Sequence, residues 1–400
     1  MARVDSTQVL ICGAGPVGLY TALLLTEFGI RCRTIDRTPR TNIHSYALAL
    51  HPRSIELLRR AGLESELNAQ GHRITRVGIL EGAANRAAVD LATLDAETPY
   101  ALVLPQSALE DILERRLRAL GVAVQWSKEL TGFREGDAEL CCSVANVVDV
   151  LQGYPVMRME RVRGSASEVT CEYLVGADGY HSAVRPLIGG EYARTAPTEH
   201  YSVFEFHTTA TDIGGEMRIS FHRGLASAFW PMRDGACRWS FQRATADEAD
   251  RTSVSDFKKL LEERAPWFAP NPTDIRWTSA AHFEPAVAST FGRKRVYLVG
   301  DSAHLTPPIG VHSMNEGIFE AHELALALAA ACGGNRSRGP LERYTAQREE
   351  FWRRYYTDRP GEALPDDDWL GALIPRLRRA LPLSGDAIHL AIQQLERAHV

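Results

Sequence analysis

Cysteine is scarce in this chain and is not arranged in metal-binding pairs. The 400 residues include seven cysteines, and none of them forms a Cys-x-x-Cys motif. This spacing makes a zinc site or a disulfide framework a poor explanation of the fold, and we predict no metal centre. Because an odd number of scattered cysteines fits a reducing compartment, we expect a cytoplasmic protein.

Long apolar runs and clusters of positive charge are also absent. No uninterrupted apolar stretch reaches the ~18 residues of a membrane span, and the short polar start gives no sign of a signal peptide. The 45 Lys and Arg residues are outnumbered by 50 Asp and Glu, and the formal net charge of -5 argues against a nucleic-acid partner. The composition, 45% hydrophobic and 24% charged over 400 residues, is typical of a globular protein with two domains.

A glycine-rich turn follows the first apolar segment of the chain. The run VLIC predicts a buried strand, Gly13, Gly15 and Gly18 stand at G-x-G-x-x-G spacing, and residues 19–28 continue as an apolar helix. Such glycines allow a tight turn, the close approach of a pyrophosphate and close helix–strand packing. A second strand ends at Asp36, about 20 residues further on, where a ribose hydroxyl is expected. The combination predicts an adenine dinucleotide site.

A second strand, loop and helix occur late in the chain. Residues 296–299 form a short apolar run typical of a buried strand, which ends at Gly300 and Asp301. Pro307 and Pro308 prevent regular pairing, and helix-forming residues follow from 313 to 331. A carboxylate beside a helix N-terminus suits a large ligand that carries hydroxyl or phosphate groups. A plain strand-turn-helix is the alternative.

A third strand also ends at an acid. Residues 172–176 predict a strand that runs into Asp178 and Gly179, and Ser182 and Arg185 follow closely. This Asp and Arg can contact a ribityl or pyrophosphate group. A β-turn with a surface salt bridge explains the motif equally well.

The remaining segments predict a second group of strands. Residues 72–101 have period-two patterns typical of a hairpin, and residues 122–126 predict a parallel strand after an amphipathic helix that begins at Gln106. Residues 139–169 resemble an antiparallel meander, and residues 200–243 alternate aromatic and polar side chains. One face of this last sheet could form an apolar substrate pocket, although a sheet packed on helices without a cavity is as plausible. The candidate pocket residues are Phe204, Arg218, Phe229, Trp230 and Trp239.

The three strand-end motifs together carry a family resemblance. The segments GAGPVG at 13–18, VGADG at 175–179 and VGDSAH at 299–304 stand in the order found in single-component FAD-dependent monooxygenases. The set closely resembles the para-hydroxybenzoate hydroxylase type of these enzymes. The resemblance implies an α/β fold with a three-layer Rossmann-type FAD-binding domain, made of a parallel sheet and an antiparallel meander. A second, α+β substrate domain is built on a mostly antiparallel sheet.

The resemblance also implies domain boundaries and site residues. The FAD-binding domain is expected at residues 1–71, 102–190 and 290–355, the substrate domain at 72–101 and 191–289, and a helical segment at 356–400. His312 and Pro307 are expected to border the flavin ring. The expected cofactor-binding residues are Gly13, Gly15, Gly18, Asp36, Arg37, Gln106, Asp178, Arg185, Asp301, Pro308, Gly310, Met314 and Asn315.

The implied chemistry belongs to the cofactor, so we predict no obligate catalytic side chain. NADPH or NADH would reduce non-covalently bound FAD, dioxygen would add at flavin C4a to give a hydroperoxide, and an aromatic ring would be hydroxylated or epoxidised. The aromatic pocket candidates suggest a hydrophobic or polycyclic substrate from secondary metabolism. We expect a monomer or homodimer.

Two other classes of function stay open. One is a flavin oxidoreductase of the same fold that performs Baeyer–Villiger oxygenation, reduction or halogenation. The Trp-x-Trp-x-Ile-Pro stretch usual in such halogenases is absent, which makes halogenation less favoured. The other class is a flavin-binding protein without catalytic activity.

The sequence departs from the family pattern in two loops. His44 and Tyr46 occupy a neighbourhood where the family usually has Arg. In the loop after Pro308, Val311 and Ser313 replace glycines, so we expect the backbone there to avoid positive φ. His312 in the same loop could contact flavin or substrate, or could be a hydrogen-bonded structural residue.

Overall fold

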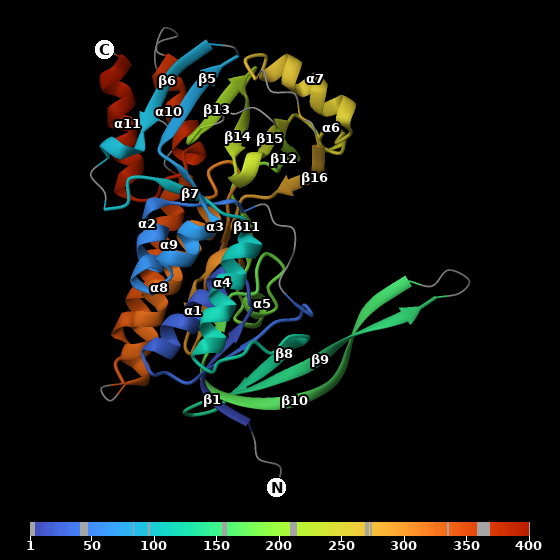
Figure 1. Cartoon of the computed structure of the whole chain (residues 1–400). Coiled ribbons are helices and arrows are strands. Elements are labelled where there is room, and N and C mark those ends of the chain that lie inside the picture. The colour runs from blue at the N-terminus through green and yellow to red at the C-terminus, as the bar shows by residue number, and fades with distance from the viewer. Residues whose placement is uncertain are drawn as a thin grey trace.

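The computed structural model describes residues 5–40, 47–82, 84–94, 97–153, 158–208, 214–268, 272, 274–333, 336–357 and 369–399. His44 and Tyr46 lie outside these residues. The described strands form two seven-stranded sheets and two three-stranded sheets. The larger sheets lie at opposite ends of the molecule, with long helices alongside the first (Figure 1).

The first sheet is built on four parallel strands. Its order is β18-β19-β10-β1-β2, with β8 and β9 continuing from β10 as an antiparallel meander. β19, β10, β1 and β2 run parallel to one another, so their carboxyl ends meet at one edge, and the short β18 is antiparallel to β19. The strands are β1 (Asp5–Cys12), β2 (Cys32–Ile35), β8 (Lys128–Glu135), β9 (Leu140–Gln152), β10 (Arg158–Gly176), β18 (Gly292–Arg293) and β19 (Val296–Leu298).

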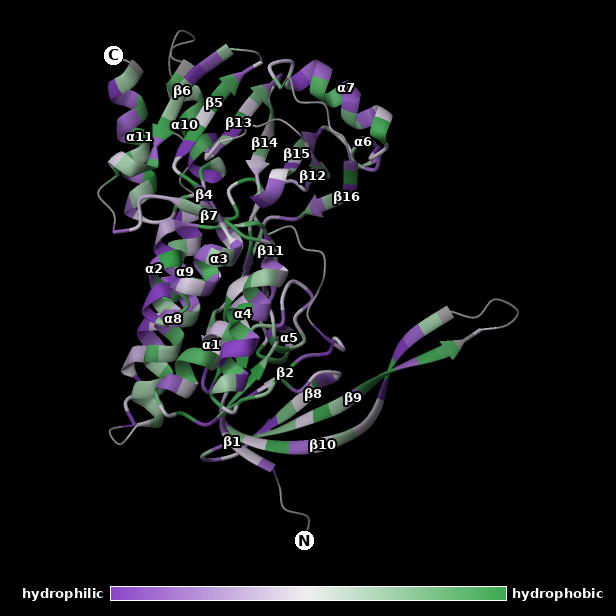
Figure 2. Ribbon diagram, in the orientation of Figure 1, coloured by the Kyte–Doolittle hydropathy of each residue, from purple (hydrophilic) through white to green (hydrophobic). Residues whose placement is uncertain are grey.

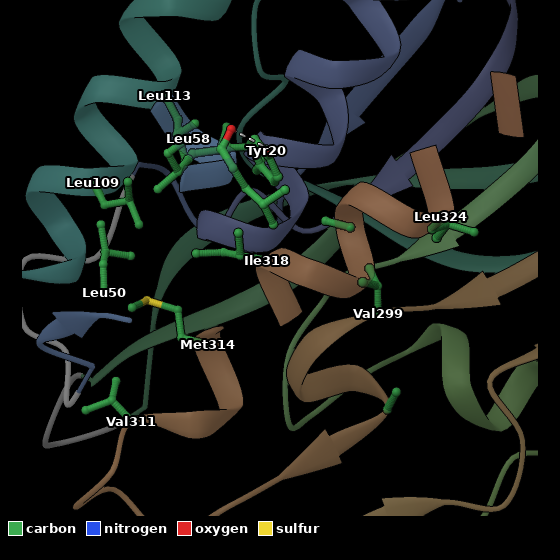
Figure 3. Packing of buried hydrophobic residues seen from close by; sticks show 14 of the residues in the cluster. Tyr20, Leu50, Leu58, Leu109, Leu113, Val299, Val311, Met314, Ile318 and Leu324 are labelled. Carbon is green, nitrogen blue, oxygen red and sulfur yellow. Dashed lines mark hydrogen bonds between the residues drawn. The ribbon is translucent and has the colours of Figure 1, made fainter. Parts of the chain in front are cut away.

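Four long helices accompany this sheet. α1 begins with Pro16, which suits a first helical position, and it is buried along most of its length because it packs against α8 and α4. Figure 3 shows Tyr20 of α1, Leu58 of α2 and Leu113 of α4 meeting in this core. The helices are α1 (Pro16–Glu27), α4 (Gln106–Ala119), α8 (His312–Cys332) and α9 (Gly339–Thr357).

The second sheet is mostly antiparallel and has the order β16-β12-β15-β14-β13-β5-β6. α7 contacts β13 and α11 contacts β6, and both helices alternate between hydrophilic and hydrophobic segments (Figure 2). The predicted hairpin in residues 72–101 is present as β5 and β6, and β5 pairs with β13 of this sheet. Its strands are β5 (Arg76–Glu81), β6 (Ala84–Asp90), β12 (Glu199–His207), β13 (Glu216–His222), β14 (Leu225–Pro231), β15 (Ala236–Arg243) and β16 (Asp274–Phe283).

Short elements connect the two sheets. One small sheet has β3 (Ala49–Leu50), β7 (Ala101–Val103) and β4 (His72–Ile74), and the other has β11 (Tyr192–Arg194), β17 (Ala286–Ala288) and β20 (His304–Leu305). The other helices are α2 (Pro52–Arg60), α3 (Glu64–Gln70), α5 (Val184–Leu187), α6 (Ala246–Ala249), α7 (Val254–Arg264), α10 (Trp369–Ala380) and α11 (Asp386–His399), with 3-10 turns η1 (Leu91–Thr93), η2 (Arg233–Gly235) and η3 (Gly300–Ser302).

One predicted strand is wrong. Residues 122–126 run beside β2 but form only an isolated parallel bridge, between Gln125 and Ile35. The segment is held by single backbone hydrogen bonds, such as Asp36 N to Gln125 O at 3.1 Å, before β8 begins. The chain leaves the parallel sheet there for the meander, so regular pairing does not extend. No helix among the described residues combines the length and apolar character needed to cross a membrane.

Candidate active site

A single elongated cleft lies along the carboxyl ends of the parallel strands. A cavity of about 240 Å³ is bounded by the segments after β1, β10 and β19 and by the start of α8. A second cavity, of about 220 Å³, is bounded by the ends of β1, β2 and β10 and by β8. Gly15, Ala177 and Gly179 belong to both walls, so the two cavities adjoin. The three strand ends that the sequence singled out therefore meet around one space.

The glycine turn after β1 shapes the middle of this cleft. Gly13 has φ +106°, and a Cβ there would lie 2.1 Å from the carbonyl oxygen of Ala177. A Cβ on Gly18 would lie 2.1 Å from the Gly13 carbonyl oxygen, so this glycine allows α1 to pack on the turn. A Cβ on Gly15 would meet nothing within 4 Å and would enter the cleft. This open cradle is what the approach of a pyrophosphate requires.

Asp36 closes the turn from the neighbouring strand. Its Oδ2 accepts a hydrogen bond from Ala14 N at 2.7 Å, and its Oδ1 accepts from Thr38 N and Thr38 Oγ1 at 2.7 and 2.6 Å. The carboxylate is thus fixed at the end of the second cavity, which Arg37 also lines. A carboxylate has further acceptor capacity for a ribose hydroxyl.

Asp178 is at the end of β10, in the wall of the second cavity. Its carboxylate accepts from Ser182 Oγ at 2.6 Å and from Ala183 N at 2.7 Å. Burial raises the pKa of Asp178, and these hydrogen bonds oppose the rise. Arg185 does not line either cavity. It donates to Ser302 O at 2.9 Å, with its guanidinium 3.9 Å from the Tyr192 ring centroid, and so ties this segment to the Asp301 turn.

Asp301 and Gln106 lie in the wall of the first cavity. Asp301 follows β19, and its Oδ1 accepts a hydrogen bond from Ser313 Oγ at 2.9 Å. Burial raises the pKa of the Asp301 carboxyl, and His304 and Ser313 act in the opposite direction. Gln106 opens α4, and its Nε2 donates to Glu110 at 2.7 Å. Two polar side chains from distant parts of the chain therefore face the same space.

The loop before α8 corrects the backbone prediction for Val311. This residue has φ 55° and ψ 33°, in the left-handed region, at the N-cap of α8. β-Branched side chains rarely adopt this conformation. It is held because Val311 N donates to Pro308 O at 3.2 Å and Asn315 Nδ2 donates to Val311 O at 2.7 Å. Ser313, the other residue in place of a glycine, is within the helix and has no positive φ.

Pro307, Pro308 and Met314 line the first cavity together with Val311. The first turn of α8 therefore faces the cleft, where its N–H groups and partial positive charge favour an anionic ligand edge. Figure 3 shows the Met314 side chain extending toward Leu50.

His312, Gly310 and Asn315 hold the loop but do not line the cleft. The prediction that His312 borders the ring is therefore corrected: its ring is fully buried and packs edge-on against His51, with centroids 5.1 Å apart. A Cβ on Gly310 would lie 2.3 Å from Arg379 O. Asn315 Oδ1 accepts from His51 N at 2.8 Å, and its Nδ2 donates to backbone carbonyls. Each of these residues has a packing role imposed by α2 or α10.

Four of the five predicted pocket residues are corrected by the structure. Phe204, Trp239, Phe229 and Arg218 pair in register across β12, β15, β14 and β13, so they form one row on one face of the second sheet. That face is covered by α7, where Phe204 stacks on Phe257 with centroids 4.5 Å apart. The alternating aromatic residues form a packed core under α7. The sequence alone does not show which face of the sheet a helix covers.

The opposite face of this sheet is turned to the cleft. Phe283, at the end of β16, lines the first cavity, and Trp277 is on the same face of that strand. Trp277 pairs with Glu205, Glu205 with Arg238, and Arg238 with Trp230, so Trp230 belongs to this face. Arg238 Nε donates to Glu205 at 2.8 Å.

Several cleft residues were not found from sequence. Ser313 was noted only as a glycine replacement, and Phe283 was not considered, although both line the first cavity. The second cavity also has contributions from Thr38, Lys128, Glu129 and His181. A general signal existed only for Thr38, which stands two residues after the strand-end acid Asp36. β8 reaches the cleft through the meander, which no local pattern specifies.

Comparison with known proteins agrees with this geometry. A family model described as an FAD binding domain matches residues 6–358. The chain belongs to this FAD-binding family. It is 30% identical over 355 residues to 6-methylpretetramide 4-monooxygenase of Streptomyces rimosus, covering 86% of this chain and 60% of that protein. It is 28% identical over 404 residues to 4-methyl-5-nitrocatechol 5-monooxygenase of Burkholderia sp, covering 92% and 67%. The chain thus spans about two thirds or less of the length of these two relatives.

Solved structures of FAD-binding family members have the same fold. p-Nitrophenol 4-monooxygenase PnpA from Pseudomonas putida DLL-E4 superposes with a TM-score of 0.74 at 20% identity, covering 99% of this chain and 94% of that chain. Aklavinone-11 hydroxylase, in a ternary complex with FAD and aklavinone, gives 0.67 at 25% identity, covering 86% and 66%. The cleft fits FAD, because an open glycine cradle, three strand-end carboxylates and a helix N-terminus line one elongated space.

Proposed function

We propose that this chain is a flavin-dependent monooxygenase that takes electrons from NADPH or NADH and uses dioxygen to hydroxylate an aromatic small molecule. The observation that carries the proposal is the continuity of the cleft from Asp36 to the start of α8. The names of its relatives support the reaction class, and aklavinone in a neighbouring structure supports a hydrophobic substrate from secondary metabolism.

The chemistry that bound FAD supplies is the acceptance of a hydride and the activation of dioxygen. The chain would supply binding and orientation. Gly15 and Asp36 would hold the adenosine side, and Asp301 and Gln106 the middle of the cofactor. The N–H groups at the start of α8 would stabilise negative charge on the ring edge that faces them.

The substrate would lie between the first cavity and the second sheet. Phe283 joins the two, and Trp277 is partly exposed farther along the same face, into which Trp230 is packed. We accordingly propose that the second sheet belongs to a substrate domain with the expected boundaries 72–101 and 191–289. The expected helical segment at 356–400 would form a third part of the chain, in which α11 contacts β6 of the second sheet and Ser384 contacts His51.

The test begins with the purified protein. It should be yellow and release FAD on denaturation, and Asp301→Ala should be nearly colourless while Ser220→Ala, on the second sheet, stays yellow.

A panel of aromatic compounds is then screened for stimulation of NADPH and NADH oxidation, with mass analysis for the gain of one oxygen. FAD-loaded protein that oxidises neither donor faster with any aromatic compound contradicts the proposal. Stimulated oxidation that yields only hydrogen peroxide would favour another flavin oxidoreductase. Size-exclusion chromatography would distinguish the expected monomer from a homodimer.

A further inference from the structure

The hydroxyl of Ser313 lies between a carboxylate in the cleft and a buried imidazole. Ser313 Oγ is 2.9 Å from Asp301 Oδ1, 3.5 Å from His304 Nδ1 and 3.3 Å from His304 O. Ser313 and Asp301 line the first cavity, whereas His304 lines neither cavity. Ser313 is at the start of α8, Asp301 is in the turn after β19, and His304 is in β20. The Ser313 side chain therefore links a carboxylate in the cleft to an imidazole in the core.

The imidazole of His304 is held in place by Glu320 and Trp352. Its Nε2 is 2.8 Å from Glu320 Oε2, and both side chains are fully buried. Glu320 also accepts hydrogen bonds from Gly300 N at 3.0 Å and Trp352 Nε1 at 2.7 Å. The His304 ring stacks on Trp352, with centroids 3.8 Å apart. Because Glu320 is held by three donors, it fixes the orientation of the ring, and Nδ1 is left facing Ser313.

This arrangement matters because Asp301 is buried, and burial disfavours the ionised form of its carboxyl group. Burial and the charge of Glu320 raise the pKa of Asp301, which favours its protonated form, whereas His304 and the Ser313 hydrogen bond lower the pKa. A protonated carboxyl loses acceptor capacity for a ligand hydroxyl. The two neighbours therefore favour the form of Asp301 that can accept.

We propose that Ser313 and His304 are positioning residues that act through Asp301, holding its carboxylate ionised and aimed into the cleft for a hydroxyl of the bound cofactor. This inference rests on the proposed function, since it takes FAD as the ligand of the first cavity. Glu320 is the anchor that keeps His304 in place. Ser313 is one of the residues that depart from the glycine-rich pattern of the family, so this link belongs to this chain.

Other titratable groups also face Asp301, and the test has to separate their effects. Tyr192 of β11 donates to the Asp301 backbone oxygen at 3.2 Å, and burial together with Asp301 raises its pKa. Tyr356 of α9 also has a pKa raised by burial, the charge of Glu320 on α8 raises the pKa of Asp301, and Arg185 of α5 is held on the neighbouring Ser302 carbonyl. The tyrosines stay neutral through the range in which a carboxyl titrates, so they do not cause a shift in that range, and Glu320 is unchanged in all the variants.

The experiment measures the dissociation constant of FAD, by quenching of flavin fluorescence on the apoprotein, from roughly pH 5 to pH 8. The variants are Ser313→Ala, Ser313→Thr, which keeps the hydroxyl, and His304→Gln. Ser220→Ala is the matched control, because it removes another poorly exposed serine hydroxyl, on β13 outside the cleft. Circular dichroism checks that each variant is folded.

Ser313→Ala should weaken FAD binding by about tenfold at neutral pH, the usual effect of one hydrogen bond to a charged group. Affinity should fall on acidification in every protein, and the fall should begin at higher pH in Ser313→Ala and His304→Gln, because each change raises the pKa of Asp301. Ser313→Thr should restore the wild-type profile. If Ser313 instead contacted FAD directly, Ser313→Ala would lower the affinity equally at all pH values.

The inference is overturned if Ser313→Ala has the wild-type affinity and pH profile, or if it weakens binding without moving the profile. Should His304→Gln not fold, the Ser313 pair still decides. A wild-type protein without FAD affinity overturns the proposed function and this inference together. A wild-type protein that binds FAD, with an unaltered Ser313→Ala variant, overturns this inference alone.

Discussion

The Nε2 atom of His51 lies 2.7 Å from the carbonyl oxygen of Gly310, although 259 positions separate the two residues. The other ring nitrogen of His51 is 2.5 Å from Ser384 Oγ, and its backbone N–H donates to Asn315. The start of α2 thus joins the loop before α8 to the C-terminal helices. Because that loop lines the cleft, the shape of the cleft depends on contacts from two distant parts of the chain, the start of α2 and the C-terminal helices.

Because Val311 has a left-handed conformation, its replacement by glycine should lower the free energy of unfolding only slightly. Val311→Gly loses a buried side chain, worth about 1.5–3 kcal/mol, and gains backbone freedom when unfolded, worth about 0.5–1 kcal/mol. It also relieves strain of about 1–3 kcal/mol. We expect the free energy of unfolding, measured in urea, to fall by only about 1 kcal/mol.

Val299→Gly is the matched control for Val311→Gly. Val299 is also buried and lines the same cavity, but its φ of -151° is ordinary extended backbone. Without strain to relieve, this change should cost about 2–4 kcal/mol. Equal losses in the two variants would show that Val311 is not strained.

His312 should make the stability of the protein depend on pH. Burial lowers its pKa to about 4 from an ordinary value of 6.5. The folded state disfavours the charged ring, so the stabilisation is complete above pH 6.5 and is lost as the pH falls toward 4. At one pKa unit to about 1.4 kcal/mol, the loss is about 3 kcal/mol.

The variant His312→Gln removes this titration and keeps a polar side chain. Thermal or urea unfolding of both proteins at several pH values isolates the contribution, because the carboxyl groups titrate equally in each. The variant should lose less stability than wild type between neutral and mildly acidic pH. Parallel curves would mean that the pKa of the His312 imidazole is the same in the folded and unfolded protein.

Gly15 should tolerate a larger residue in the fold but not in function. Its backbone, with φ -72° and ψ 179°, is accessible to any residue, and a Cβ would meet only open space. Gly15→Val should therefore change the free energy of unfolding by about 1 kcal/mol or less. It should remove most FAD affinity, because the side chain fills the cleft.

Gly132→Val provides the comparison for Gly15→Val. Gly132, on β8, also has no neighbour within 4 Å and no positive φ, but it lines neither cavity. It should bind FAD like wild type. Equal flavin content in both variants would place the pyrophosphate elsewhere.

The two faces of the second sheet can be separated with two tryptophans. Trp239 and Trp230 are 0% and 2% exposed, on adjacent strands but opposite faces. Trp239→Phe should lower stability by about 1–3 kcal/mol, through a cavity under α7, and leave the substrate KM unchanged. Trp230→Phe should change KM for the aromatic substrate. A KM effect confined to Trp239→Phe would return the substrate to the α7 face.

Local patterns predicted much of this fold because they report how one segment is buried. The apolar runs at residues 9–12 in β1 and 296–298 in β19 are buried because parallel strands are covered on both sides. The amphipathic spacing of α4 likewise predicted a helix with one buried face. The segment at 122–126 is also rich in apolar residues, but it pairs with β2 at one residue only, because β2 ends there, at Ile35.

By itself, the sequence determined the three strand-end acids and the glycine turn, since the residue types needed for a tight turn and for a strand that ends in a carboxylate are written locally. Tertiary structure alone decided which face of the aromatic sheet met the cleft, which loop residues faced inward, and that Ser313 would touch both Asp301 and His304. The physical reason is that a side chain's direction follows from the elements packed against it, and those elements, such as α7 against β12, are separate segments of the chain.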